Sequence, residues 1–383
     1  MYDLAIFGNS NVAYILTRQA LDKGLKVLLI GKFNFHSAVF GVVKDFLLDT
    51  ALKINSVKNL ENAGILVSLE GLSFSKIIKK RDEIAEKEFV KIRNTFRDSN
   101  LTLLEDGEFL NNYTFKNGKN HYLFKNLVIA KEPEYSPKAG FCVMDDVPFM
   151  EDYPRQIVID GADNNAIEIA FILAQFYAKV HIIDKKSLIL PSVSSEFNDC
   201  ILKNLKKEKI KFYPNTQINE IDNNIYLDSG IKLQNGLLIN NVRKNDDFEP
   251  LKKLNLEMID GKIKTDKYLK TNYENIFFIA KDFSSKEQAS CIISNLLQKN
   301  SQEFLKIDYK SLIINKRMAQ IGSFDPMNYL TLKIKNTYTK LSLKDNKIQG
   351  VQVLDDKNEV LPFLYFAIKK GLSFQELENI LVG

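Results

Sequence analysis

A chain of 383 residues is long enough for two or three domains of ordinary size, and its 45% hydrophobic and 26% charged residues are typical of a folded globular protein. The formal net charge of +5 is small and the lysines are spread along the chain, so nothing indicates a nucleic-acid partner. No apolar run approaches the ~20 residues that span a bilayer, and MYDLAIFG opens a strand-like run without a basic leader, so we expect no membrane span and a cytoplasmic location.

A strand, helix and strand pattern opens the chain. Residues 3–7 form an apolar run suited to a buried parallel strand, and residues 12–23 place apolar side chains at helical spacing. Gly24 can end this helix, and residues 26–30 form the next apolar run. The order predicts a βαβ unit.

Residues 73–95 read as a long amphipathic helix with Ile77, Ile84, Phe89 and Ile92 inward and lysines outward, where a solvated face is favoured over a basic binding surface. The following runs, with turns at Asp106-Gly107 and Asn117-Gly118, predict a small antiparallel insertion.

The pattern then repeats with nearly the same internal spacing. Residues 156–160 and 180–184 read as strands around a helix at residues 166–177, and that helix is apolar on most sides, which predicts burial. A further apolar run occupies residues 276–280. From residue 309 onward, alternating strands and a final helix predict a separate α+β unit.

The order of these pieces resembles the pyridine nucleotide-disulfide oxidoreductases, most closely the dihydrolipoamide dehydrogenase branch. The stretches that carry the resemblance are DLAIFGNSNVAYILTRQALDKGLKVLLIGK, QIVIDGADNNAIEIAFILAQFYAKVHIIDKKSLILP, GKIKTDKYLKTNYENIFFIA, AQIGSF, KIQGVQVLDDKNEV and AIKKGLSFQEL. In that family one dinucleotide-binding unit holds FAD, the other holds NAD(P)H, and a cysteine pair passes electrons to a disulfide.

The resemblance implies an α/β fold with two Rossmann-like dinucleotide-binding domains and a C-terminal α+β interface domain. We expect an FAD-type domain at 1–150 and 256–305, an NAD-type domain at 151–255, and a shortened dimerisation domain at 306–383 that makes a homodimer.

The first phosphate-binding turn departs from the GxGxxG pattern. Its three positions hold Gly8, Ser10 and Ala13, of which Ala13 is an accepted variant and Ser10 adds a neutral side chain. Ser10 and Asn11 either contact a cofactor or cap their own helix, and the two interpretations weigh equally. Gly31 stands where an acid would bind a ribose.

The second turn holds Gly161, Asp163 and Ala166. Asp163 would repel a pyrophosphate, but it makes a good helix cap together with Asn164. Asp184 keeps the acid expected to hold the adenosine ribose, although an aspartate before two lysines is more often a polar turn.

Other family signatures have drifted. Ala130 begins Ala-Lys-Glu where the family has alanine, threonine and glycine, and Asp282 lies one position late for the flavin-contacting Gly-Asp pair. From these departures we expect no NAD(P)H binding in the family manner and doubt FAD binding, while keeping it open. The predicted cofactor-binding positions are Gly8, Ser10, Asn11, Ala13, Ala130, Asp282, Gly161 and Asp184.

Residues for chemistry are missing from their family positions. Residues 33–53 contain no cysteine, and Cys142, Cys200 and Cys291 are scattered without metal-ligand spacing, so we predict neither a dithiol relay nor a metal site. The family's His-Pro-Thr segment would begin where this chain ends. His36 is the one histidine near the expected flavin, and a lone loop histidine is usually polar surface. We predict no catalytic residue.

Three hypotheses follow. The leading one is a catalytically degenerate family member that acts by binding or scaffolding, with a protein partner. The alternative is an FAD-dependent oxidoreductase that passes electrons from NAD(P)H or another donor to a non-disulfide acceptor. In the third, the old cleft near Asp184 binds a different nucleotide or metabolite.

Overall fold

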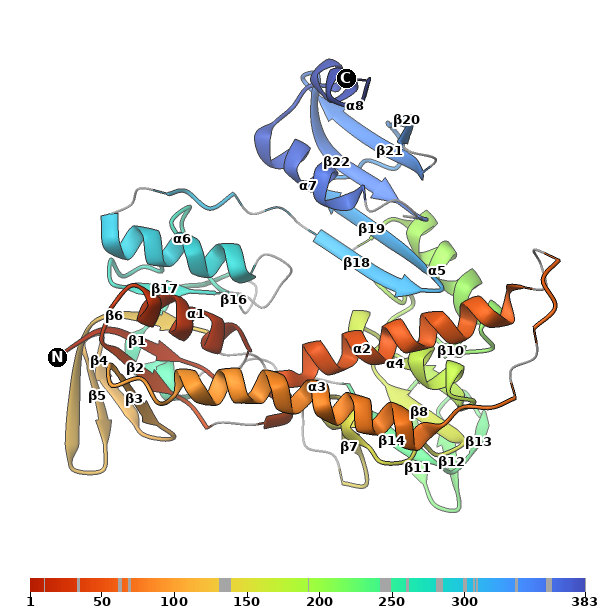
Figure 1. The fold of residues 1–383 in the computed structure, drawn as a ribbon, viewed down its shortest axis with the longest axis horizontal. Helices are drawn as coiled ribbons and strands as arrows, with labels where there is room; N and C mark the ends of the chain where they lie inside the picture. The colour runs from red at the N-terminus through yellow and green to blue at the C-terminus, as the bar shows by residue number, and fades with distance from the viewer. Residues whose placement is uncertain are drawn as a thin grey trace. The chain divides into compact units, whose positions relative to one another are not determined.

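A computed structural model describes the chain except for residues 10, 33–34, 61–63, 68–69, 131–138, 192, 242–248, 260–261, 280–284, 299–301, 306, 308, 335–336, 356–359 and 383. The chain forms two compact units (Figure 1). The first unit comprises Met1–Val43, Ser75–Ser136 and Arg243–Leu305; the second comprises Lys44–Phe74, Pro137–Val242 and Lys306–Gly383.

The first unit is built on a seven-stranded sheet of order β3-β2-β1-β6-β5-β4, with β17 pairing with β6. Its strands β1, β2, β3, β6 and β17 run parallel, whereas β4 and β5 extend β6 as an antiparallel meander. The bounds are β1 Tyr2–Phe7, β2 Val27–Ile30, β3 Leu101–Leu104, β4 Glu108–Asn111, β5 Thr114–Asn117, β6 Asn120–Ile129 and β17 Ile276–Phe278. The predicted antiparallel insertion is therefore confirmed for β4 to β6 but wrong for residues 101–104, which join the parallel sheet beside β2.

The same unit contains the helices α1 (Asn11–Asp22), α3 (Phe74–Thr95) and α6 (Ser285–Gln298). Helix α1 packs against α6 (Figure 1). Helix α1 ends at Asp22, and Gly24 follows in the turn, as expected, with a φ of +73° that suits a glycine. On α3 the buried residues are Arg81, Ala85 and Ile92. Ile77, Ile84 and Phe89 are only half-buried, so the predicted inward face is rotated toward Arg81. Smaller elements are η3 Glu249–Leu254, β15 Met258–Ile259 and β16 Lys262–Ile263.

The second unit contains a parallel sheet of order β10-β9-β8-β14-β7. Its strands are β7 Cys142–Val143, β8 Gln156–Asp160, β9 Lys179–Ile183, β10 Lys211–Tyr213 and β14 Leu237–Asn240. A small antiparallel sheet, β11 Ile218–Ile221, β12 Asn224–Leu227 and β13 Lys232–Gln234, packs apolar side chains against it. Helix α4 (Asn164–Gln175) is buried along most of its length, as its apolar sequence predicted. The same unit holds α2 from Lys44 onward (whole helix Phe35–Lys58), α5 Ser195–Lys207 and η2 Met144–Phe149.

The last part of the chain is an antiparallel sheet of order β18-β19-β22-β21-β20 with two helices. The bounds are β18 Tyr309–Ile314, β19 Lys316–Gly322, β20 Leu330–Ile334, β21 Thr337–Lys344, β22 Lys347–Val353, α7 Leu361–Lys370 and α8 Phe374–Val382. Leu341, Val351 and Leu364 lie in its core at 0% exposure, and the combination of strands and helices confirms the predicted α+β architecture of this part of the chain. None of the described helices is long and apolar enough to cross a membrane.

Candidate dinucleotide sites

The first turn is held by backbone contacts at the carboxyl end of β1. The N–H of Gly8 donates to the carbonyl of Ile30 at 2.9 Å. A Cβ atom placed on Gly31 would lie 2.6 Å from the carbonyl oxygen of Gly8, far inside van der Waals contact. Gly31 therefore lets the end of β2 approach the first turn more closely than a residue with a side chain could at this position.

Several predicted site residues gather around this turn. Asn11 is the first residue of α1, Ala13 two residues later is fully buried, and α1 has no acidic residue in its first turn. The N–H of Ala130 donates to the carbonyl of Phe7 at 2.8 Å, which places Ala130 at the same edge of the sheet. Ser10 and Asp282, like Lys131, Glu132, Ala280 and Lys281, lie outside the described residues. The helix start and the strand ends form an edge of the kind that receives a pyrophosphate.

The second turn repeats the same backbone bond, because the N–H of Gly161 donates to the carbonyl of Ile183 at 2.8 Å. Asp163 caps α4, and its Oδ1 accepts the N–H of Ala166 at 2.9 Å, which confirms the predicted cap. The side chain of Asn164 instead donates to the carbonyl of Ser311 in β18 at 2.7 Å. The start of α4 is therefore fixed at both its cap and its first residue.

Asp184 follows β9 and is 8% exposed. Its Oδ2 accepts the N–H of Ala162 at 2.7 Å, and its Oδ1 accepts the N–H of Lys186 at 2.9 Å. Asp184 is thus a structural anchor of the second turn. Each carboxylate oxygen has a second lone pair, so the residue retains acceptors for a ribose hydroxyl.

A buried ion pair that sequence reasoning missed lies behind the second turn. The Lys44 ammonium in α2 is 2.5 Å from the Glu168 carboxylate in α4, and the two side chains are 14% and 9% exposed. Lys44 also donates to Asn165 at 3.2 Å, and the other Glu168 oxygen accepts the N–H of Ile313 at 3.1 Å. The only signal in the sequence was one charged residue inside an otherwise apolar helix.

Two further titratable groups among the described residues, His181 and Cys142, are poor candidates for chemistry. Burial, reinforced by Lys211 and Lys179, lowers the pKa of His181 to about 4, and its Nδ1 lies 3.0 Å from the Tyr213 hydroxyl. Burial, with Asp146 adding to it, raises the pKa of the Cys142 thiol to about 11, so this sulfur stays protonated at neutral pH. Among the described residues, no three His, Cys, Asp or Glu side chains converge as metal ligands would.

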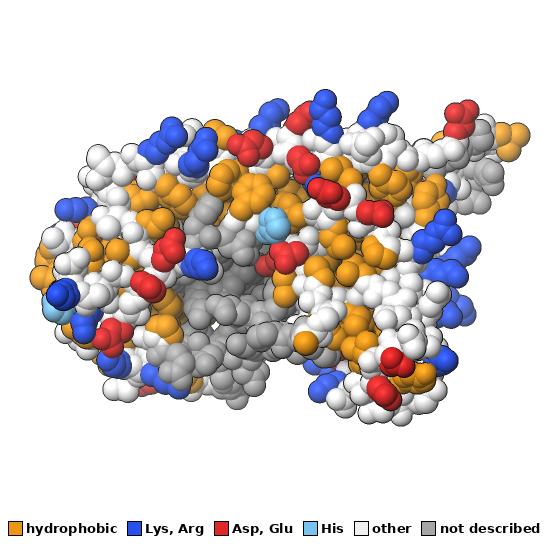
Figure 2. All heavy atoms as spheres, turned by 90° about the horizontal axis from the view of Figure 1, so that it is seen from below, with side chains coloured by type: hydrophobic (Ala, Val, Ile, Leu, Met, Phe, Trp, Pro, Cys, Tyr) orange, Lys and Arg blue, Asp and Glu red, His pale blue; other side chains and the backbone are white. Residues whose placement is uncertain are grey.

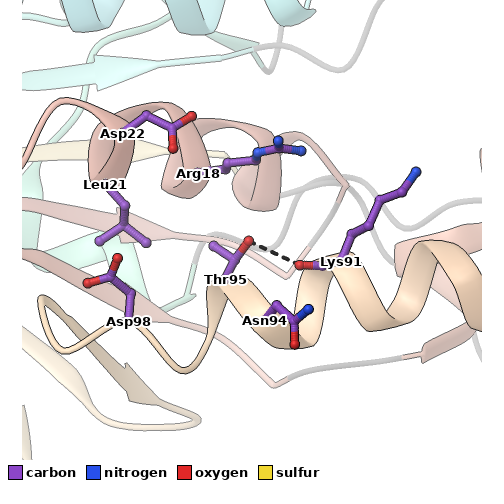
Figure 3. A pocket seen from close by; sticks show the side chains of 7 residues that line it. All are labelled: Arg18, Leu21, Asp22, Lys91, Asn94, Thr95 and Asp98. Atoms are coloured by element: carbon purple, nitrogen blue, oxygen red, sulfur yellow. Dashed lines mark hydrogen bonds between the residues drawn. The ribbon is translucent and has the colours of Figure 1, made fainter.

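A separate surface cavity of about 340 Å³ lies between α1 and α3 in the first unit. Figure 3 shows the side chains that line it: Arg18, Leu21, Asp22, Lys91, Asn94, Thr95 and Asp98. These α1 residues belong to the second half of the helix, remote in sequence from the turn at Gly8.

On the face drawn in Figure 2, basic and acidic side chains are interspersed with apolar ones.

Comparisons with known proteins identify relatives of most of the chain. Residues 2–284 match the model of the family described as pyridine nucleotide-disulphide oxidoreductase. The chain is 25% identical over 315 residues to dihydrolipoyl dehydrogenase of Acholeplasma laidlawii, covering 73% of this chain and 89% of that protein. It is 23% identical to dihydrolipoyl dehydrogenase of Mycoplasma pneumoniae, covering 73% of this chain and 65% of that protein.

Solved structures agree in fold. The Cu(II) complex of the HOCl-induced flavoprotein disulfide reductase RclA from Escherichia coli has a TM-score of 0.77 at 16% identity, covering 98% of this chain and 94% of that one. The RclA structure described without copper gives a TM-score of 0.76.

These relatives correct the expectations for cofactors. We expected FAD binding to be doubtful and NAD(P)H binding in the family manner to be absent; both expectations are wrong, because the match to the pyridine nucleotide-disulphide oxidoreductase model spans both dinucleotide turns and the sequence relatives are dihydrolipoyl dehydrogenases. The physical reason is that such a turn depends on backbone N–H groups and close strand contacts, which Gly8 and Gly161 retain. The side chains of Ser10 and Asp163 therefore matter less for cofactor binding than the departure from the glycine pattern suggested.

Fold, turn geometry and sequence comparison agree across most of the chain. The protein belongs to the pyridine nucleotide-disulphide oxidoreductase family.

Proposed function

We propose that this protein is an FAD-dependent oxidoreductase that passes electrons from NAD(P)H or another donor to an acceptor other than a disulfide. The observation that carries the proposal is the first turn, in which Gly31 packs directly on Gly8 and α1 begins without an acid in its first turn. An edge built in this way accepts the pyrophosphate of a dinucleotide. Gly8, Asn11, Ala13 and Ala130 would hold FAD, with Ser10 and Asp282 as further contacts, and Gly161 and Asp184 would hold the nicotinamide dinucleotide.

The choice of acceptor follows from the cysteines. Residues 33–53 contain none, and the Cys142 thiol has a pKa of about 11, so it is a poor nucleophile. Bound FAD would supply hydride and electron chemistry without a thiol. The protein's own contribution is then to bind and orient the two dinucleotides and to exclude side reactions.

The same absence of cysteines supports a second candidate function. A family member that binds its cofactors without turning over would act by binding or scaffolding with a protein partner. It differs from the first candidate in one respect, the transfer of electrons from a donor through the flavin to an acceptor.

The proposal includes the division into an FAD-type domain at 1–150 and 256–305, an NAD-type domain at 151–255 and a dimerisation domain at 306–383, in a cytoplasmic homodimer. Apolar side chains of the last domain are available for such an interface: Met327 is 91% exposed, Tyr338 67% and Phe366 48%. Light scattering coupled to size-exclusion chromatography tests this, with a dimer mass expected and a monomer mass contradicting it.

The test of function is anaerobic reduction of the FAD-loaded protein by NADH, followed by addition of acceptors. We expect the visible flavin band to bleach, a quinone to restore it, and lipoamide or another disulfide to leave it bleached. Reoxidation by the disulfide would contradict the proposed acceptor class. A flavin band that no donor bleaches would favour the scaffolding candidate.

A further inference from the structure

Asn241 carries a buried polar atom that the fold leaves unused. It follows β14 directly, is 6% exposed, and donates its backbone N–H to the carbonyl of Asp160 at 2.9 Å. Its side-chain Nδ2 lies 3.4 Å from the carbonyl oxygen of Gly161, the first glycine of the second turn. Its Oδ1 has no hydrogen-bond partner among the described residues.

The assignment of the two amide atoms is fixed by Gly161. A carbonyl oxygen only accepts, so the amide nitrogen of Asn241 must face it, and turning the amide over would place two acceptors together. The oxygen is therefore the orphan. A buried acceptor without a donor destabilises the fold, and such atoms are uncommon in native structures unless a ligand or water satisfies them.

The topology places Asn241 at the carboxyl end of β14, beside the point where the strand order of the sheet reverses. The chain runs from β8 through α4 to β9 on one side of β8, whereas β14 pairs with β8 on the other side. The strand order therefore reverses between β8 and β14, and dinucleotides bind outside the carboxyl ends of the strands at such a point. Asp184 lies on the β9 side, where it suits the adenosine ribose. Asn241 lies on the β14 side, where it would contact the other half of the dinucleotide, the nicotinamide nucleoside.

We propose that Asn241 Oδ1 accepts a hydrogen bond from the nicotinamide-nucleoside half of NAD(P)H and so helps to select this donor. The inference rests on the proposed function. That half of the ligand offers two kinds of donor, the ribose hydroxyls and the carboxamide NH₂, and either would satisfy the orphaned oxygen. Asn241 is a binding residue in this account.

The test compares Asn241→Leu, which keeps the shape and removes both polar atoms, with Asn241→Ala, which also removes the packing. Equilibrium titrations with NADH, ADP-ribose and AMP are combined with the melting temperature of the ligand-free protein. We expect both variants to bind NADH about three- to tenfold more weakly, the usual worth of one hydrogen bond, and to bind AMP unchanged. Loss of ADP-ribose affinity as well identifies a ribose hydroxyl as the donor, and unchanged ADP-ribose affinity identifies the carboxamide.

The ligand-free melting temperature separates ligand binding from a structural role. Because Asn241→Leu removes an unsatisfied buried acceptor, its melting temperature should stay level or rise while NADH affinity falls. The matched control is Asn204→Leu in α5, a buried asparagine whose Nδ2 is satisfied by the carbonyl of Cys200 at 2.8 Å; it should lose stability and keep NADH affinity.

Two results would overturn the inference alone: NADH affinity equal to that of the parent in both variants, or a fall in melting temperature with Asn241→Leu comparable to that with Asn204→Leu. A parent protein that binds FAD but shows no NADH binding would overturn both this inference and the nicotinamide part of the proposed function. The parent titration therefore distinguishes the two failures.

Discussion

The two dinucleotide turns of this protein align residue for residue, yet they are braced differently. Gly8 and Gly161 make the same backbone bond to the end of the neighbouring strand, at 2.9 and 2.8 Å. At the next position Gly31 packs its Cα against the first turn, whereas Asp184 binds the second turn through its carboxylate. Strand pairing and apolar packing therefore determine the conformation of the turn. The residue at the end of the second strand can differ without changing that backbone bond.

The two units also differ in the polarity of equivalent residues in the helix and the second strand. Glu168 on α4 corresponds to Ile15 on α1, and His181 on β9 corresponds to Leu28 on β2. The first unit places apolar side chains at both positions, whereas the second buries an ion pair and a neutral histidine. Substitutions that leave a charge unpaired should consequently cost most in the second unit.

The largest effect is expected at the ion pair. Lys44→Met leaves the Glu168 carboxylate buried without its partner, and this should lower the free energy of unfolding by about 3–5 kcal/mol. The double variant Lys44→Met/Glu168→Leu should recover much of that loss, because no unpaired charge remains. Urea denaturation measures both. A single variant that loses less than ~1 kcal/mol would show that the pair is well solvated.

The next effect is at Gly31. In Gly31→Ala the new Cβ would meet the carbonyl of Gly8, so the first turn must shift, at a cost of about 1–3 kcal/mol and most of the bound FAD. The control is Gly41→Ala inside α2, where a Cβ meets nothing within 4 Å; it should retain FAD and gain about 0.5–1 kcal/mol. The flavin-to-protein ratio after purification is the readout, and equal flavin content in both variants would contradict the steric account.

A smaller, pH-dependent effect is expected at His181. Its pKa falls from an ordinary 6.5 to about 4 on folding, so between these values the unfolded chain binds more protons than the native protein. Stability should therefore be full above pH 6.5 and decrease as the pH falls toward 4, by at most about 1.4 kcal/mol per pH unit from this group. His181→Leu, which copies Leu28, should flatten this part of the profile. His121→Gln, at an exposed position, should leave the profile unchanged.

The smallest effect is expected at Asp163. Asp163→Ser keeps a side chain that caps α4 and matches Ser10 of the first turn, so stability should change by less than about 0.5 kcal/mol. Because one negative charge leaves the start of the helix, NADH should bind severalfold more tightly at low salt. Isothermal titration checks this, and unchanged affinity at low salt would mean that the pyrophosphate lies away from the cap.

Sequence patterns predicted what depends on local periodicity. Strand β8 has the predicted bounds, and α4 is buried as its apolar residues required. Contacts between distant segments could not be predicted from the sequence. Residues 101–104 pair with β2 in parallel, and Arg81 rather than Ile77 faces inward on α3. Such outcomes depend on which surfaces meet in the folded chain, and local spacing does not encode this.

The residues of the candidate site likewise include some that could be predicted from the sequence and some that could not. Positions aligned with a known turn, such as Gly8 and Asp184, could be located from the sequence. The Lys44–Glu168 pair joins two helices far apart in the chain, and the orphaned oxygen of Asn241 is defined by what surrounds it. The doubt about cofactors came from side chains at the turns, whereas the backbone geometry determines whether such a turn can form.

The most direct test of the central claim is the flavin content of the purified protein, measured from its visible absorption spectrum and from the cofactor released on denaturation. The account predicts near-stoichiometric FAD, either as purified or after incubation with excess FAD. A protein that stays colourless after that incubation would contradict the claim that the turn at Gly8 still binds a dinucleotide.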